Sequence, residues 1–145
     1  MNLIDLRKEV ENDLKFDESS LDSESLKIPQ LHSKYLNFLT DSKLKIFKYQ
    51  KDYDSLYRKK WEYYTGKLSD EELKNLNWPQ FQLKLLRTDV DMYLKTDEDL
   101  QNLETKILIE KEKFNYIESI IKGIMNRHWM IRSAIDFRKF ISGVG

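Results

Sequence analysis

Apolar and aromatic residues recur every seven positions along two stretches of this chain, and each stretch carries a second row offset from the first. The rows of the first stretch are Ile28, Tyr35, Ser42, Tyr49, Leu56 and Tyr63, and His32, Leu39, Ile46, Tyr53 and Lys60. The rows of the second stretch are Leu100, Ile107, Phe114, Ile121, His128 and Ile135, and Leu103, Glu110, Ile117, Ile124, Ile131 and Arg138. Such heptads are typical of helices that pack along a shared seam. The pattern predicts an all-α fold, with two long helices in an antiparallel coiled-coil-like hairpin plus short helices.

The N-terminal part of the chain is predicted to precede the first long helix. Residues 1–24 show helical spacing of apolar residues behind Asn2, a suitable N-cap, and then an acidic, serine-rich linker. Pro29 fits best in the first turn of a helix, which places the predicted helix start near Ser25. We therefore expect the first long helix over residues 25–66.

Turn signals divide the remaining residues. Gly66 suits the left-handed turn that ends a helix. Residues 67–96 are predicted to form short helices, and Phe81 and Leu85 are expected to lie in the second of them. Residues 97–143 are predicted to form the long C-terminal helical segment. With 145 residues the chain is long enough to bury one core, so we expect a single helical domain.

The composition favours a helical protein inside the cell. Only four glycines and two prolines are present, and 34% of the residues are charged. The absence of cysteine excludes disulfides and thiolate zinc sites, as expected in a reducing compartment. The first residues do not resemble a secretion signal, and no uncharged apolar run approaches the length of a membrane span. We expect a soluble protein with no membrane partner.

Charge is balanced overall but unevenly distributed. The chain has 25 basic and 25 acidic side chains. Residues 43–67 hold eight cations against three anions, and residues 120–145 hold five against one. Residues 1–30 and 68–99 each hold four cations against eight anions. A polyanion responds to the local potential within about 8 Å at physiological salt rather than to the net charge, so a net charge of zero does not exclude a polyanion as ligand.

Residues 58–67 bring cations and aromatic rings together at the end of the first long helix, and we name them the basic-aromatic segment. The residues predicted to contact nucleic acid are Arg58, Lys59, Lys60, Trp61, Tyr63, Tyr64 and Lys67. Cations bind phosphates and rings stack on unpaired bases, so the segment predicts sequence-tolerant binding of a single strand. A plainer interpretation is that the cations complement the helix dipole and Tyr63 packs in the seam. Trp61 and Tyr64 lie off that seam, so part of the aromatic area is expected to face outward.

Signatures of catalysis are missing from the sequence. It contains no glycine-rich phosphate loop, no Cys/His metal spacing and no nucleophile elbow. The two histidines, His32 and His128, fall at seam positions, where packing is their expected role. We therefore expect a protein without enzymatic activity, cofactor or metal.

The second long helix carries more apolar surface than one partner helix can cover. Off its main seam lie Ile120, Met125, Trp129, Ala134, Phe137 and Phe140. Either a small helix of the same chain or further copies of the chain must cover this face, and few elements are left to do so. We therefore expect a homo-oligomer.

Two other function classes fit the same residues. A structural coiled-coil adaptor would share both seams and lack affinity for DNA. An RNA-binding regulatory or packaging protein would share the basic-aromatic segment and discriminate through the 2′-hydroxyl.

Four pieces of the chain also stand in a recognisable order. They are residues 31–37, residues 58–66 with their Tyr-Tyr-Thr-Gly ending, residues 94–97 and residues 131–143. Together they resemble the UvsY family of T-even-like phage recombination mediators, and the resemblance spans nearly the whole chain. None of the four pieces is a catalytic signature.

The resemblance implies a ring-like homo-oligomer, a hexamer or heptamer, in the cytoplasm of an infected bacterial host. Such a protein binds single-stranded DNA, helps displace the phage single-strand-binding protein and loads a RecA-like recombinase of the UvsX type, in homologous recombination, replication and repair. The family's DNA-binding cations fall on Arg58 and Lys60. The family's self-association maps onto Met125, Trp129, Ile131, Ile135 and Phe140.

Overall fold

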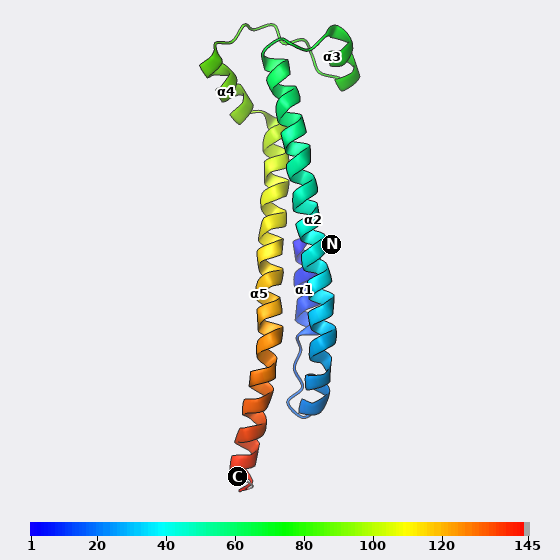
Figure 1. Ribbon diagram of the computed structural model, residues 1–145, viewed down its shortest axis with the longest axis vertical. Coiled ribbons are helices and arrows are strands. Elements are labelled where there is room, and N and C mark those ends of the chain that lie inside the picture. Colours follow the sequence, from blue (N-terminus) through cyan, green and yellow to red (C-terminus); the bar gives the residue numbers. More distant parts are fainter. Residues whose placement is uncertain (144–145) are drawn as a thin grey trace. The chain divides into compact units, whose positions relative to one another are not determined.

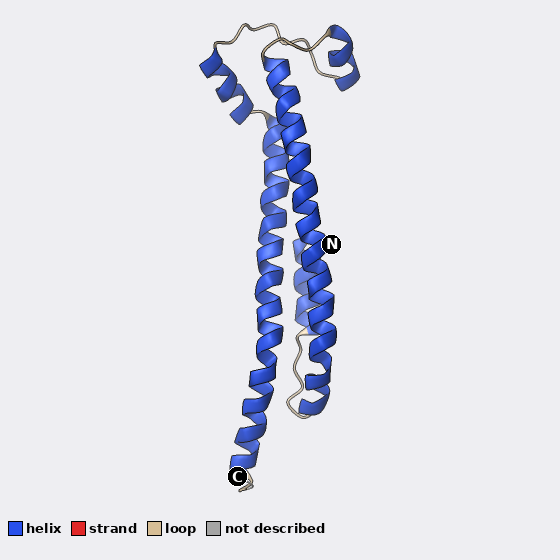
Figure 2. Cartoon of the chain, viewed as in Figure 1, coloured by secondary structure: helices blue, strands red, loops and turns tan. Residues whose placement is uncertain are grey.

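The structure of the protein is a computed structural model that describes residues 1–143. Within these residues the chain forms five helices and no strand, so the predicted all-α fold class is confirmed (Figure 1 and Figure 2). Their contacts divide the chain into two compact units. Unit 1 combines residues 1–43 with the residues from 111 onward, and unit 2 comprises Leu44–Glu110. None of the helices in the described part of the chain has an apolar stretch long enough to cross a membrane.

The first helix, α1 (Leu3–Asp13), lies in unit 1 and confirms the predicted amphipathic helix. The side chain of Asn2 accepts a hydrogen bond from the Asp5 amide at 2.8 Å, which satisfies one of the free N–H groups at the helix start. The apolar face of α1 covers part of both long helices. The buried residues of this core are Leu6, Val10, Tyr35, Ile117 and Ile124.

Helix α2 (Leu21–Tyr64) begins earlier than predicted, and Pro29 lies inside it rather than in its first turn. The prediction of a start near Ser25 was wrong because tertiary contacts stabilise an earlier turn. Leu21 is buried, and the buried carboxylate of Glu24 lies 3.7 Å from the guanidinium of Arg127. These contacts offset the backbone hydrogen bond that proline cannot donate.

In unit 2 the chain leaves α2 through two short helices, α3 (Asp70–Leu76) and α4 (Arg87–Lys95). Residues 79–86 between them are not helical, so the prediction that placed Phe81 and Leu85 in a helix was wrong. Their side chains are half-buried and pack inward from an irregular segment. Apolar spacing was therefore a poor guide here, because burial does not require a regular element.

Helix α5 (Glu98–Ile141) begins in unit 2 and continues into unit 1. Helix α2, by contrast, begins in unit 1 and continues into unit 2. Asp97 caps it by accepting a hydrogen bond from the Leu100 amide at 2.9 Å. Every heptad position named for α2 is buried or half-buried, and those of α5 are covered as far as Ile124. Within each unit the two long helices therefore pack along the predicted seam.

Candidate nucleic-acid interface

The basic-aromatic segment ends α2 in unit 2, where Gly66 allows the chain to turn back. Gly66 has a φ of 71°, in the left-handed region, and a Cβ built there meets no atom within 4 Å. The amide of Gly66 donates to the Tyr63 carbonyl at 3.2 Å, and the amide of Lys67 donates to the Glu62 carbonyl at 2.8 Å. These two bonds form a Schellman motif, which satisfies the last carbonyls of the helix. Helix α2 itself ends at Tyr64, and Gly66 makes the left-handed turn that its sequence position favours.

This turn returns Lys67 to the last turn of α2, beside Trp61. The ammonium of Lys67 lies 4.2 Å from the centroid of a Trp61 ring, within the range of a cation–π contact. Trp61 is 38% exposed, and Lys67 is exposed as well. The indole of Trp61 and the ammonium of Lys67 are therefore adjacent, and both are accessible to a ligand.

Two further cations of the segment point to solvent. The side chain of Arg58 is 82% exposed, and its Nε lies 3.3 Å from Glu62 one helical turn later. Lys59 is exposed too. A surface ion pair of this kind is weak and screened by salt, so Arg58 can exchange Glu62 for a phosphate at little cost.

Lys60 lies differently from its neighbours, because its side chain is buried. Its ammonium lies 2.7 Å from Asp99 and 3.1 Å from Asp97, and 4.2 Å from a Trp78 ring centroid. Burial disfavours the charged ammonium, but the hydrogen bonds to Asp99 and Asp97 outweigh it and raise the pKa of Lys60. The charge of Lys60 is thus compensated inside unit 2 rather than offered to a ligand.

Tyr63 and Tyr64 also pack inward. Tyr64 donates a hydrogen bond to Asp97, and Tyr63 donates one to the Pro79 carbonyl. The rings of both tyrosines contact Phe81, at centroid distances of 5.6 Å and 5.1 Å. The expectation that part of the aromatic area faces outward holds for Trp61 but not for Tyr64, because the carboxylate of Asp97 gives the Tyr64 hydroxyl a partner inside unit 2.

The predicted residues therefore fall into two groups. The outward group consists of Arg58, Lys59, Trp61 and Lys67, which we name the outward set. The inward group consists of Lys60, Tyr63 and Tyr64. Helical spacing explains the division. Positions 60 and 63 belong to the predicted seam, and position 64 follows 60 by four residues and therefore lies on the same side of α2, unlike positions 58, 59 and 61.

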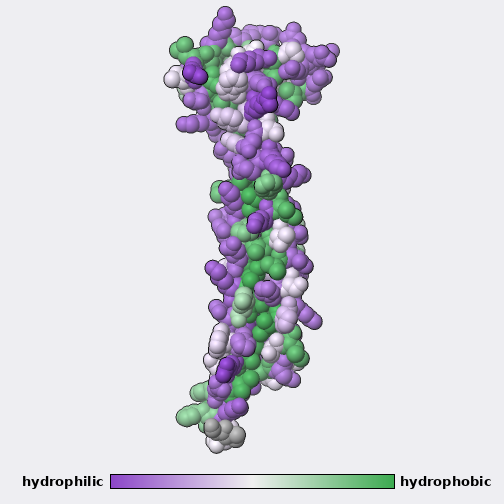
Figure 3. Space-filling view, viewed as in Figure 1, coloured by the Kyte–Doolittle hydropathy of each residue, from purple (hydrophilic) through white to green (hydrophobic). Residues whose placement is uncertain are grey.

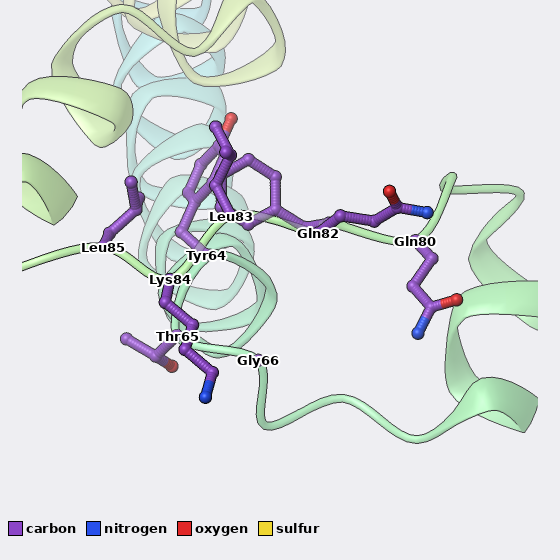
Figure 4. A pocket seen from close by; sticks show the side chains of 9 residues that line it. Tyr64, Thr65, Gly66, Gln80, Gln82, Leu83, Lys84 and Leu85 are labelled. Carbon is purple, nitrogen blue, oxygen red and sulfur yellow. The ribbon is translucent and has the colours of Figure 1, made fainter.

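Two of the hollows that border the segment in unit 2 have volumes of about 470 Å³ or more. The larger, of about 790 Å³, runs from the end of α2 to the extended residues after Pro79 and includes Lys84 (Figure 4). The second, of about 470 Å³, is lined by Trp61, Thr65, Lys67, Leu85, Arg87, Val90 and Asp91, and we name it the Trp61 pocket. Lys84 and Arg87 escaped prediction because they belong to residues 68–99, where anions outnumber cations and no motif marks them.

A metal site would need at least three His, Cys, Asp or Glu side chains close together. The described residues contain no such group. What the outward set offers is binding chemistry, namely phosphate contacts and a ring on which a base can stack.

Comparison with known proteins decides the family. The family described as "Recombination, repair and ssDNA binding protein UvsY" matches residues 9–144. The chain belongs to this UvsY family. The recombination protein uvsY of Enterobacteria phage T4 is 22% identical to it over 143 residues, which cover 99% of each protein.

Solved structures from the UvsY family share the fold. A crystal structure of the bacteriophage T4 recombination mediator protein UvsY, lattice type IV, has a TM-score of 0.83 and 20% identity, over 97% of this chain and 99% of that one. A second crystal form, lattice type II, has a TM-score of 0.83 and 21% identity, over 98% of both chains. At this identity the likeness establishes the UvsY fold, while the roles of individual residues rest on the geometry above.

The C-terminal part of this UvsY-family chain exposes a second set of residues, in unit 1. Of the five residues predicted for self-association, four are exposed: Met125 at 57%, Trp129 at 61%, Ile135 at 38% and Phe140 at 79%. Hydrophobic residues, coloured green, reach the surface at the lower end of the view in Figure 3. Ile131 is only 5% exposed, so its own chain already covers it. Met125 and Trp129 also line a groove of about 610 Å³ with His32 and His128. We name the four exposed residues the tail patch.

Proposed function

We propose that this protein is a recombination mediator that binds single-stranded DNA as a homo-oligomer and helps load a RecA-like recombinase onto strands covered by single-strand-binding protein. The observation that carries the proposal is the outward set, in which three accessible cations occur with an accessible indole near the end of α2, and one of them, Lys67, lies over the indole. Membership of the UvsY family, whose description includes recombination, repair and single-stranded DNA binding, supports it.

A single strand suits the outward set better than a duplex does. Arg58, Lys59 and Lys67 supply charge for successive phosphates, and Trp61 supplies a flat surface for a base. Only an unpaired base can leave its stack to reach such a surface. No element of the described chain presents the helix-turn-helix arrangement that reads duplex DNA.

Lys60 takes a supporting part in this proposal. Because its ammonium is paired with Asp97 and Asp99, it fixes the last two turns of α2, which carry Arg58 and Trp61. The contact of Lys60 with a phosphate stays a prediction, and such a contact would require the ion pairs to open.

Self-association through the tail patch would convert weak single contacts into avid binding. A hexameric or heptameric ring presents one outward set per subunit, so the second and later contacts along a strand become intramolecular. Linked contacts of this kind raise the overall affinity by about 10² to 10⁴. A strand spread over several subunits is held open for a recombinase of the UvsX type while the phage single-strand-binding protein is displaced.

This activity consists of binding rather than catalysis, and it needs no cofactor. The partners are single-stranded DNA, the recombinase and the single-strand-binding protein, in the cytoplasm of an infected bacterium. The acidic residues 1–30 and 68–99 are the candidate surfaces for protein partners.

The test is an anisotropy titration of labelled oligodeoxythymidylate at two salt concentrations. We expect the double variant Arg58→Ala/Lys59→Ala to bind at least about tenfold more weakly, with the slope of log affinity against log salt reduced by about 1.4, or about 0.7 for each phosphate that is no longer neutralised. The matched control, Lys43→Ala/Lys45→Ala, removes two exposed cations from the same helix outside the segment. Equal affinity of the Arg58/Lys59 variant and the wild type would contradict the site, and equal binding of duplex DNA or RNA would favour another function class.

A further inference from the structure

The Trp61 pocket brings together side chains from four parts of unit 2. Trp61 stands on the last turn of α2, Lys67 follows that helix, and Arg87 and Asp91 lie on α4. Leu85, from the segment before α4, completes the apolar part of the wall. Its volume of about 470 Å³ falls in the range of small-molecule sites.

We infer that this pocket takes one unstacked nucleotide of the bound strand, with the base against Trp61 and the phosphate between Arg87 and Lys67. The inference rests on the proposed function and adds Arg87, which lies 26 positions from Trp61 in the sequence, to the binding surface. Arg87 is exposed, and it forms no ion pair with the residues that the structure describes. Its planar guanidinium therefore remains available for bidentate contact with phosphate oxygens.

The side chains that line the pocket differ in chemistry, and each kind suits a different part of the nucleotide. The indole and Leu85 form an apolar surface that suits the face of a base. Arg87 and Lys67 supply positive charge for the phosphate. Asp91 repels phosphate oxygens, so the phosphate lies by the two cations and the base edge lies nearer the carboxylate.

Asp91 also favours a nucleotide within a strand over a free one. A phosphodiester carries one negative charge, whereas the terminal phosphate of a mononucleotide carries about −1.5 to −2 near neutral pH. Two cations and one carboxylate therefore balance a phosphodiester more closely than a free phosphate monoester.

Lys67 couples the two parts of the site. Its ammonium lies 4.2 Å from the Trp61 ring centroid, and both residues line the pocket. A base that stacks on this face displaces the ammonium, which is then free to meet the phosphate of the same nucleotide. One side chain thus covers the indole before binding and neutralises charge after it.

The inference is tested by comparing oligodeoxythymidylate with an abasic oligonucleotide of the same length, which keeps the phosphates and lacks the bases. We expect the wild type to bind the abasic strand more weakly, by roughly fivefold at least. A fivefold change corresponds to the lower limit of the free energy that one stacked base contributes. Trp61→Ala is expected to lose this difference, and Trp61→Phe, which keeps a flat ring, is expected to retain part of it. Circular dichroism melting of each variant shows whether it remains folded.

Arg87 is tested against a charge-matched change on the same helix. Arg87→Ala is expected to weaken binding of oligodeoxythymidylate by about tenfold or more, the lower limit for one hydrogen bond to a charged group. Lys95→Ala removes one exposed cation from the other end of α4 and is expected to change affinity less than twofold. Deoxythymidine monophosphate is expected to compete poorly with the labelled strand.

Three results would overturn the inference while leaving the proposed function in place. They are an undiminished base dependence in folded Trp61→Ala, equal effects of Arg87→Ala and Lys95→Ala, and competition by the mononucleotide as strong as by the strand. Failure of the wild type to bind any single strand would instead overturn the proposed function, and this inference with it.

Discussion

Lys60 and Asp97 form a buried ion pair in unit 2, with the ammonium 3.1 Å from the Oδ2 of the carboxylate. Their side chains are 8% and 4% exposed. The same carboxylate accepts a hydrogen bond from Tyr64 and caps the first turn of α5. One aspartate therefore joins the end of α2 to the start of α5, across the segment that holds α3 and α4.

Removing one partner of this pair leaves the other charge buried without compensation. We expect Lys60→Met, which keeps an unbranched apolar side chain, to lower the free energy of unfolding by about 3 kcal/mol. Arg58→Met, at a position where the side chain is 82% exposed, is expected to change it by less than about 0.5 kcal/mol. Urea unfolding followed by circular dichroism measures both. Similar stability of the two variants would show that Lys60 does not hold this end of α2.

Asp97 should make stability depend on acid pH. Burial acts to raise its pKa, but hydrogen bonds from Tyr64 and the Leu100 amide, with those of Lys60, outweigh burial and lower the pKa from its usual 3.8. Below about pH 4 the unfolded chain therefore binds more protons than the folded chain, so stability falls as the pH falls through the folded pKa.

The variant Asp97→Asn cannot titrate at this position. Its free energy of unfolding is expected to be lower than that of the wild type at neutral pH and to decline less steeply with acid. Urea unfolding at a series of pH values below about 5 measures the two slopes. A decline as steep as that of the wild type would assign the acid sensitivity to other carboxylates.

The tail patch makes a prediction about assembly. We expect Trp129→Ser/Phe140→Ser to reduce the molar mass measured by light scattering, because it removes apolar area that a neighbouring copy would bury. Leu44→Ser/Phe47→Ser is a matched control, since those two side chains are also exposed, at 63% each, and lie in unit 2. Loss of assembly in the control alone would place the interface elsewhere on the chain.

Much of the fold followed from periodicity and local end signals. The heptads predicted covered positions along α2, and along α5 as far as Ile124, because a seven-residue repeat keeps one helical face toward a partner. His128, Ile135 and Arg138 continue the α5 rows and are exposed, so the expected packing of His128 was wrong. Asn2 and Gly66 act as predicted, because helix ends depend on a few neighbouring residues.

The errors arose where contacts between distant residues decided the outcome. Pro29 lies inside α2 because Leu21 and Glu24 are buried ahead of it. Besides the neighbouring Lys27, Glu24 has a second cation from far along the chain, Arg127. Lys60 and Tyr64 turn inward because Asp97, more than thirty positions away, offers both of them a carboxylate. A motif of cations and aromatic rings predicts which ligand a segment can bind. It does not show which of these side chains already contact other residues of the same chain.

The turn at Gly66 fixes the spacing between the indole and its covering ammonium. Each added residue rotates a helix by about 100°, so a single insertion between Trp61 and Gly66 would carry Lys67 to another side of the axis without altering the local composition. Related proteins whose helix ends carry the same numbers of cations and aromatic rings can therefore differ in their affinity for a single strand. Loop length at this point, rather than the tally of lysines and arginines, should distinguish strong binders from weak ones.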